Sequence, residues 1–339
     1  MNFLTVTAHR VRLKYMSQPV NGLYRNWCRG AAAYLVLLLA LVPTGIVYFQ
    51  VRAYVAARDR ARFDEVVRLT QEKIEERITH HADELLGLRG LFAADRKVEW
   101  AEWESYVASL ELPRRYPGLR AFGYAQRVDH ADRAGFVSQM RQSIAPDFEI
   151  FPAGNREFYF PMIYMNPFED GAKKNLGWDG YSEPARRAAM DEAGETGKSI
   201  ASSRVQMMAG DGTNLIHGFV IFSPIFKSGA PVKSGPERRA ALQGFVSSAF
   251  LPEKLLDGSF PRSRRATVSV EIFDGAELAS ENLLYASRRP SKEARPLFSQ
   301  TVPISVLGRT WSLRFTTLPS FESDSEGYLP LTALAGGLV

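Results

Sequence analysis

An uncharged, mostly apolar run of 19 residues, 31–49, constrains this chain more than any other part of its sequence. As a helix with a rise of about 1.5 Å per residue, the run is roughly 28 Å long, which matches the hydrocarbon core of a bilayer. Tyr24 and Trp27 precede the run and Tyr48 lies at its end, where interfacial aromatic residues are expected. The sequence therefore predicts a transmembrane helix at residues 31–50.

The charge before this run predicts its orientation. The chain has 42 Lys+Arg and 37 Asp+Glu, a net charge of +5. Residues 1–29 hold five basic residues and no acidic one, so the rest balances at 42 − 5 = 37 against 37. Residues 1–30 should stay in the cytoplasm, which places residues 51–326 in the periplasm of an inner-membrane protein. Because the excess charge lies in a short tail, we expect no nucleic-acid partner.

A cleaved signal peptide is the alternative for the apolar run. Against it, 29 residues precede the run, and no small-x-small cleavage site follows it closely. The chain ends in a second apolar stretch, residues 328–339, which is too short to span a bilayer. We interpret residues 327–339 as the start of a second, truncated transmembrane helix. A short core strand or helix is the alternative.

Residues 51–93 are rich in Lys, Arg and Glu and predict a long stalk helix. Positions spaced alternately four and three residues apart form a mostly apolar stripe, close to a heptad pattern. The stripe consists of Val67, Gln71, Ile74, Ile78, His81, Leu85, Leu88 and Phe92. It predicts either the seam of a homodimer or the face that packs on the following domain.

Beyond residue 94, helical and β-rich segments alternate, and their order predicts an α+β fold with mainly antiparallel sheets. A loop rich in Gly, Pro and Ser at residues 227–237 divides this region. We expect a membrane-distal subdomain at residues 94–236 and a smaller membrane-proximal one at residues 237–326.

The residues present predict no enzyme. No nucleophile–base pair or metal-ligand cluster stands out, and the single cysteine, Cys28, excludes an intrachain disulfide. We therefore predict no catalytic residue, no metal site and no cofactor.

One segment does predict a binding site. Residues 158–164 place large aromatic and sulfur-containing side chains on a strand, and Asp179 follows nearby. A carboxylate among aromatic side chains needs a hydrogen-bond partner, and in an apolar pocket it would orient a ligand that carries N–H or cationic groups. The alternative is that Asp179 caps the helix that begins near Pro184.

Several short blocks between residues 77 and 321 share the order and spacing of a known family. They are Tyr116-Pro117-Gly118 with Phe122-Gly123-Tyr124, Pro161-Met162-Ile163-Tyr164, Gly177-Trp178-Asp179 with Pro184-Ala185-Arg186, Glu195-Thr196-Gly197-Lys198, Gly218-Phe219 with Pro224-Ile225-Phe226, Gln243-Gly244-Phe245-Val246 and Gly308-Arg309-Thr310-Trp311. In these blocks the chain resembles the CHASE domain, the extracytoplasmic sensor of cytokinin-receptor-like proteins. Asn166 departs from the family pattern, where glutamate is usual.

The resemblance implies two PAS-like subdomains after the stalk helix, with the ligand in the membrane-distal one. In the cytokinin-binding branch of the family, the aspartate that matches Asp179 hydrogen-bonds the adenine ring. The ligand-binding residues expected on this basis are Asp179, Tyr164, Met162, Trp178, Ala201, Phe222, Phe245 and Ser247. The expected partner is a small organic ligand, with an adenine-like molecule as one candidate.

The predicted function is that of a membrane-anchored receptor module, a homodimer that senses a small molecule outside the cell. It would signal to an output domain after residue 339, which in this family is a histidine kinase, a diguanylate cyclase or an adenylate cyclase. The alternative is an extracytoplasmic dimerisation or interaction module without a ligand.

Overall fold

The computed structural model describes residues 21–94, 98–111, 118–167, 175–208, 215–256, 267–288, 295–323 and 325–338. The chain divides into two units, one of residues 1–58 with 326–339 and the other of residues 59–325. The long helix α1 (Asn21–Ala94) contributes to both.

In the first unit, α1 carries the predicted membrane span. Its apolar side chains are exposed there, with Leu35, Leu38 and Phe49 at 63%, 62% and 65% exposure. The core helix of a soluble domain would bury such residues. Within the part of the chain that the structure describes, α1 is the one helix long and apolar enough to cross a membrane. The apolar helix α10 (Leu329–Leu338) follows the second unit, and its identity as the start of a second membrane helix stays a prediction.

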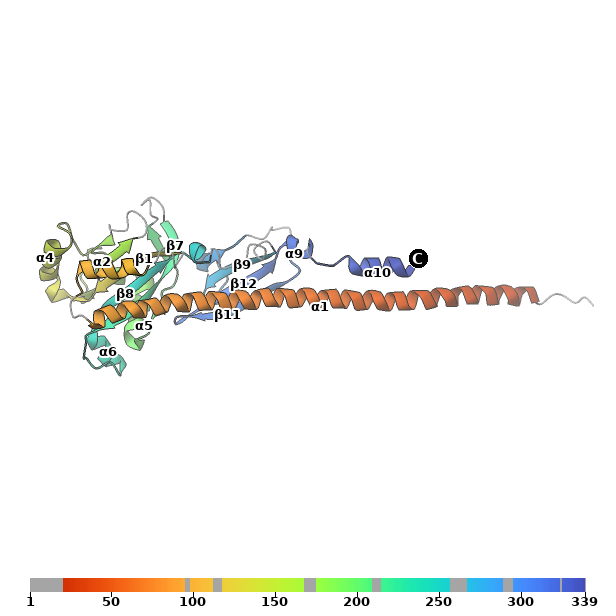
Figure 1. Cartoon of the computed structure of the whole chain (residues 1–339), viewed down its shortest axis with the longest axis horizontal. Coiled ribbons are helices and arrows are strands. Elements are labelled where there is room, and N and C mark those ends of the chain that lie inside the picture. The colour runs from red at the N-terminus through yellow and green to blue at the C-terminus, as the bar shows by residue number, and fades with distance from the viewer. Residues whose placement is uncertain are drawn as a thin grey trace, which may run out of the picture. The chain divides into compact units, whose positions relative to one another are not determined.

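The second unit contains two large antiparallel sheets, which confirms the predicted α+β class with antiparallel sheets (Figure 1). The first sheet has the order β4 (Met162–Pro167), β1 (Leu119–Gln126), β8 (Leu242–Phe250), β7 (Leu215–Phe226), β5 (Ile200–Ala201), with β6 (Val205–Met208) also on β7. The second has the order β10 (Leu283–Ala286), β9 (Val268–Asp274), β12 (Arg309–Thr317), β11 (Ser299–Val306). A short pair joins β2 (Val128–Asp129) to β3 (Phe158–Tyr159).

Short helices connect these strands. The α-helices are α2 (Trp100–Ser109), α4 (Arg133–Ser143), α5 (Pro184–Thr196), α6 (Gly235–Ala241), α7 (Pro252–Leu256) and α9 (Pro319–Ser323). The 3-10 turns are η1 (His130–Asp132), η3 (Gly180–Ser182) and η4 (Ser280–Asn282).

The expected subdomain boundary at 236/237 is wrong by one helix and one strand. Strand β8 follows that boundary, yet it pairs with β1 and β7 in the middle of the first sheet. The first subdomain therefore extends to Phe250. The Gly- and Pro-rich loop at residues 227–237 connects neighbouring strands of one sheet and does not separate two subdomains.

The apolar stripe on α1 packs against its own chain. Seven of its eight residues are buried, and Gln71 is partly exposed. Along the helix, the ring centroids of Phe63 and Phe298, beside the second sheet, lie 5.5 Å apart. Those of His81 and Phe250 of β8 lie 4.7 Å apart. Of the two interpretations of the stripe, the packing face is therefore the one that the structure supports.

The buried His81 makes stability depend on pH. Burial, with smaller effects of Arg77 and His80, lowers the pKa of His81 from 6.5 to about 3. The unfolded chain then binds a proton near pH 6.5 that the folded chain does not accept until about pH 3. The free energy of unfolding should stay level above pH 6.5 and fall below it, by up to about 1.4 kcal/mol per pH unit.

Chemical denaturation at pH 7.5 and pH 5.5 checks this expectation. The wild-type chain should lose about 1.4 kcal/mol between the two pH values, and His81→Phe should lose much less, since it cannot take up the proton. An equal loss in both proteins would show that other groups cause the dependence.

The two faces of the first sheet contact different helices. On β1, Phe122 and Tyr124 belong to the cluster that also contains α1 side chains, and the rings of Tyr124 and Phe92 lie 4.2 Å apart. Ala125 belongs instead to the cluster that contains Met190 of α5. Since successive side chains on a strand point to opposite faces, one face packs on α1 and α2 and the other faces α5.

Candidate ligand-binding site

A cavity of about 300 Å³ lies on the face of the first sheet that α5 covers; we call it the apolar cavity. Four of the eight predicted binding residues line it, namely Met162, Trp178, Phe222 and Ser247. Apolar walls, a few polar groups and a volume near the lower end of ~300–1,000 Å³ are typical of small-molecule sites.

The cavity forms because small residues pair across β1 and β8. Gly123 lies opposite Ser247 and Ala121 opposite Ala249, and all four line the cavity. Side chains of directly opposite residues stand about 4.5–5.5 Å apart, so four small ones leave a continuous space above the sheet. A Cβ at Gly123 would lie 2.4 Å from the Met162 Sδ atom. Any larger residue there would therefore displace Met162.

Arg186 is the buried charge of the cavity. Its side chain is only 9% exposed, and its guanidinium lies 4.6 Å from the centroid of the Trp178 ring. Nη2 donates a hydrogen bond to the Gln206 carbonyl at 3.2 Å, and Nη1 pairs with the Glu183 carboxylate. Burial lowers the pKa of Arg186 from its ordinary value, and Glu183 opposes this effect. The cavity thus holds a largely desolvated cation beside an aromatic ring.

Asp179 lies next to the cavity but outside its lining. The residue is fully buried, and its Oδ1 accepts hydrogen bonds from the backbone N–H groups of Phe160 at 3.0 Å and Tyr181 at 3.1 Å. Its Oδ2 lies 3.0 Å from Arg156 Nε. The two groups form an ion pair, but the angles between them are not those of a hydrogen bond. The carboxylate therefore caps η3, so the capping alternative holds in a modified form: the capped turn is η3, not the helix at Pro184.

The remaining predicted residues have other surroundings. Tyr164 faces α2, where its hydroxyl donates to the Val98 carbonyl at 2.6 Å and its ring stacks on Trp103. Ala201 is buried in β5, and its N–H donates to the Leu307 carbonyl at 3.0 Å. Phe245 lines a different hollow. The structure therefore does not bring these three residues to the apolar cavity.

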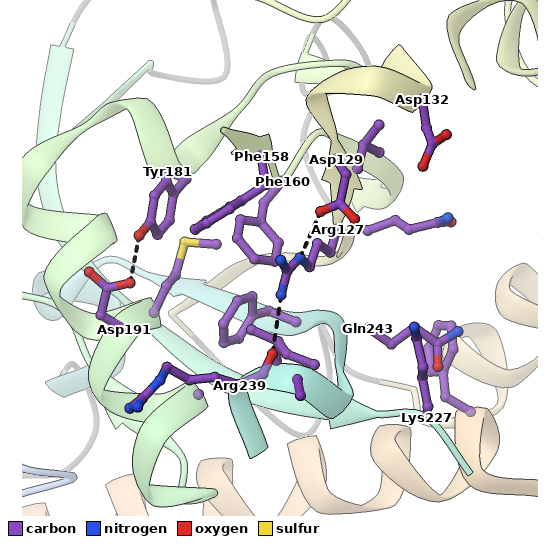
Figure 2. A pocket seen from close by; sticks show the side chains of 18 of the residues that line it. Arg127, Asp129, Asp132, Phe158, Phe160, Tyr181, Asp191, Lys227, Arg239 and Gln243 are labelled. Atoms are coloured by element: carbon purple, nitrogen blue, oxygen red, sulfur yellow. Dashed lines mark hydrogen bonds and ion pairs between the residues drawn. The ribbon is translucent and has the colours of Figure 1, made fainter. Parts of the chain in front are cut away.

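That second hollow, the charged cleft, has a volume of about 1070 Å³ (Figure 2). Arg127 donates to Asp129 and to the Arg239 carbonyl, both at 3.1 Å, and Tyr181 donates to Asp191 at 2.6 Å. The side chains of Asp129 and Arg239 are 60% and 54% exposed, so water screens their charges. The apolar cavity, where polar groups are few and buried, is the stronger candidate for a ligand.

Arg186 is the charged, buried site residue among those that the sequence predictions missed. It stands in a block already noted, beside a second arginine, Arg187. A helical pattern distinguishes the two, because Ala189, Met190 and Ala193 follow Arg186 at the spacing of one helix face and are buried with it. This stripe is the sequence signal from which the place of Arg186 on the inner face of α5 could have been predicted.

Comparison with known proteins finds a curated relative and solved structures that are weakly similar. Probable histidine kinase 4 of Oryza sativa subsp. japonica is 26% identical over 199 residues, which cover 58% of this chain and 19% of that protein. The ligand-binding domain of the Pseudomonas aeruginosa PAO1 amino acid chemoreceptor PctC, solved with GABA, is 12% identical with a TM-score of 0.44, covering 76% of this chain and 98% of that one. That of PctB, solved with L-Arg, is 12% identical with a TM-score of 0.42, covering 82% and 99%.

The family assignment rests on the sequence of the first subdomain and the strands after it. The model of the CHASE domain matches residues 96–285, more than half of the chain. The matched region contains the apolar cavity and every predicted binding residue. The chain belongs to the CHASE domain family.

Proposed function

We propose that this chain is the membrane-anchored sensory part of a receptor, which binds a small organic molecule in the apolar cavity. Met162, Trp178, Phe222 and Ser247 would contact the ligand, and Asp179 would hold the surrounding backbone in place. The observation that carries the proposal is the paired row of small residues on β1 and β8, because it keeps open a space that larger side chains would close.

The signal would pass through the first sheet to α1. Ligand contacts lie on one face of β1 and β8, and α1 packs on the other face, where Phe92 meets Tyr124. A small shift of these strands would bias two arrangements of the packed helix. The same helix contains the predicted membrane span, so it offers a continuous element for transmission.

The output of the whole receptor is part of this proposal. The rice relative is named a histidine kinase, and this chain spans 19% of its length. We propose a histidine kinase as the output domain, with a nucleotide cyclase as the alternative. The receptor would act as a homodimer in the inner membrane, with residues 51–326 in the periplasm.

Filling the cavity tests the proposal. Ala249→Phe places a ring among the small residues of the cavity, whereas Gln243→Phe places the same ring on the same strand at the charged cleft. Thermal melts of the full chain in detergent, with a library of small metabolites, identify compounds that stabilise the wild type. Such compounds should stabilise Gln243→Phe equally and bind Ala249→Phe at least tenfold more weakly. Full stabilisation of Ala249→Phe would place the ligand elsewhere.

A further inference from the structure

The polarity of the apolar cavity points to one class of ligand, and this inference rests on the proposed function. Among the described residues that line the cavity, two are arginines and none is an aspartate or a glutamate. Arg186 is the buried one of the two. Its guanidinium is held against the Trp178 ring, so its position is fixed before any ligand arrives.

Arg186 keeps hydrogen-bonding capacity for a ligand. A guanidinium has five N–H donors in one plane, and the contacts with Glu183 and Gln206 use two of them. Its carboxylate partner Glu183 is 34% exposed, so the ion pair lies at the edge of the cavity while the arginine side chain lies inside. A ligand carboxylate could accept hydrogen bonds from the remaining N–H donors of this buried guanidinium.

The neighbouring carboxylate, Asp179, is poorly placed to accept hydrogen bonds from a ligand that is rich in donors. Asp179 is the residue expected to accept N–H groups of an adenine-like molecule. Its Oδ1 accepts two backbone N–H groups, and its Oδ2 forms an ion pair with Arg156 that lacks hydrogen-bond angles. Asp179 is fully buried and does not line the cavity, so a ligand rich in donors would not meet it there, whereas a ligand rich in acceptors would meet Arg186.

We propose that the ligand is a small amphipathic monoanion, an aromatic or branched aliphatic carboxylate. Its carboxylate pairs with Arg186 beside Trp178. Its apolar part lies against Met162 and Phe222, above the small residues of β1 and β8. Arg186 is then the specificity-determining residue of the site, because it selects a carboxylate over the neutral amide of the same shape.

Matched probes test this assignment on the full chain in detergent. The carboxylates are 3-phenylpropionate, indole-3-acetate and 4-methylpentanoate, each compared with its primary amide, and adenine is the donor-rich comparison. At least one carboxylate should bind ten times more tightly than its amide and than adenine. Arg186→Gln should weaken carboxylate binding at least tenfold and leave amide binding unchanged. Arg239→Gln, at the exposed rim of the charged cleft, is the matched control and should bind like the wild type.

The outcomes separate this inference from the proposed function. Equal binding of carboxylate and amide, tighter binding of adenine, or no binding of any carboxylate overturns the anionic ligand. If such binding is lost in Ala249→Phe but unchanged in Arg186→Gln, the cavity is the site and the ligand class is wrong. Binding that Ala249→Phe leaves unchanged contradicts the proposed function itself. Should Arg186→Gln fail to fold, Arg186→Lys together with the carboxylate–amide ratio of the wild type decides the question.

Discussion

Changing Asp179 to asparagine is expected to lower the free energy of unfolding by about 3 kcal/mol, the lower end of the ~3–5 kcal/mol for breaking a buried ion pair. An asparagine carbonyl could still accept from the N–H groups of Phe160 and Tyr181. Its amide group, however, would face the Arg156 guanidinium, donor against donor, at a site that is fully buried on the carboxylate side. The estimate takes the lower end because the Arg156 side chain is 21% exposed.

Chemical denaturation of the full chain in detergent measures this effect. Asp191→Asn is the matched control, because Asp191 accepts from Tyr181 at an exposed position and should cost less than about 1 kcal/mol. Replacing Arg156 with methionine as well should recover part of the loss, since the two residues form one interaction. A loss below about 1 kcal/mol for Asp179→Asn would mean that this carboxylate is not a structural anchor.

Changing Gly177 to alanine is expected to cost about 3 kcal/mol or more, the sum of backbone strain and crowding. Gly177 has a φ of +83°, and a Cβ on it would lie 1.9 Å from the Glu149 carbonyl oxygen. Its N–H donates to the Met162 carbonyl at 2.7 Å. The glycine thus fixes the chain at the point where Trp178 enters the cavity wall, so the variant should also weaken ligand binding.

A second glycine separates the two causes. Gly229 has a φ of +77°, but no atom lies within 4 Å of a Cβ built on it. Gly229→Ala should therefore cost only the strain of the left-handed conformation, about 1 kcal/mol. Equal losses in the two variants, measured by the same denaturation, would rule out the contact with Glu149 as a cause.

The sequence predicted the element types and the membrane span because those depend on local patterns. The apolar run of residues 31–49 and the stripe on α1 follow from composition and helical spacing alone. The subdomain boundary was wrong because a loop rich in Gly and Pro looks the same within a sheet and between two domains. Only the pairing of β8 with β1 and β7 places that strand.

The candidate site was predictable in part. The aromatic and sulfur-containing residues near Asp179 indicated a pocket, and Met162 and Trp178 do line the cavity. The role of Asp179 could not be read from its motif, because its partners are backbone N–H groups and an arginine 23 residues earlier, whose approach depends on the folded chain. The cavity itself depends on register, since Gly123 and Ser247 meet only when β1 and β8 are aligned.

Methionine methyl NMR tests most directly whether the ligand occupies the apolar cavity. Four methionines line the cavity; Met162, Met165 and Met207 line it alone, whereas Met190 also lines the charged cleft. Met140 is buried in α4, in the cluster of the opposite side. With ε-¹³C-methionine in the full chain, a compound that raises the melting temperature should shift the three cavity methyl signals and leave that of Met140 in place. Saturation with such a compound that leaves all three cavity signals unchanged would contradict the account.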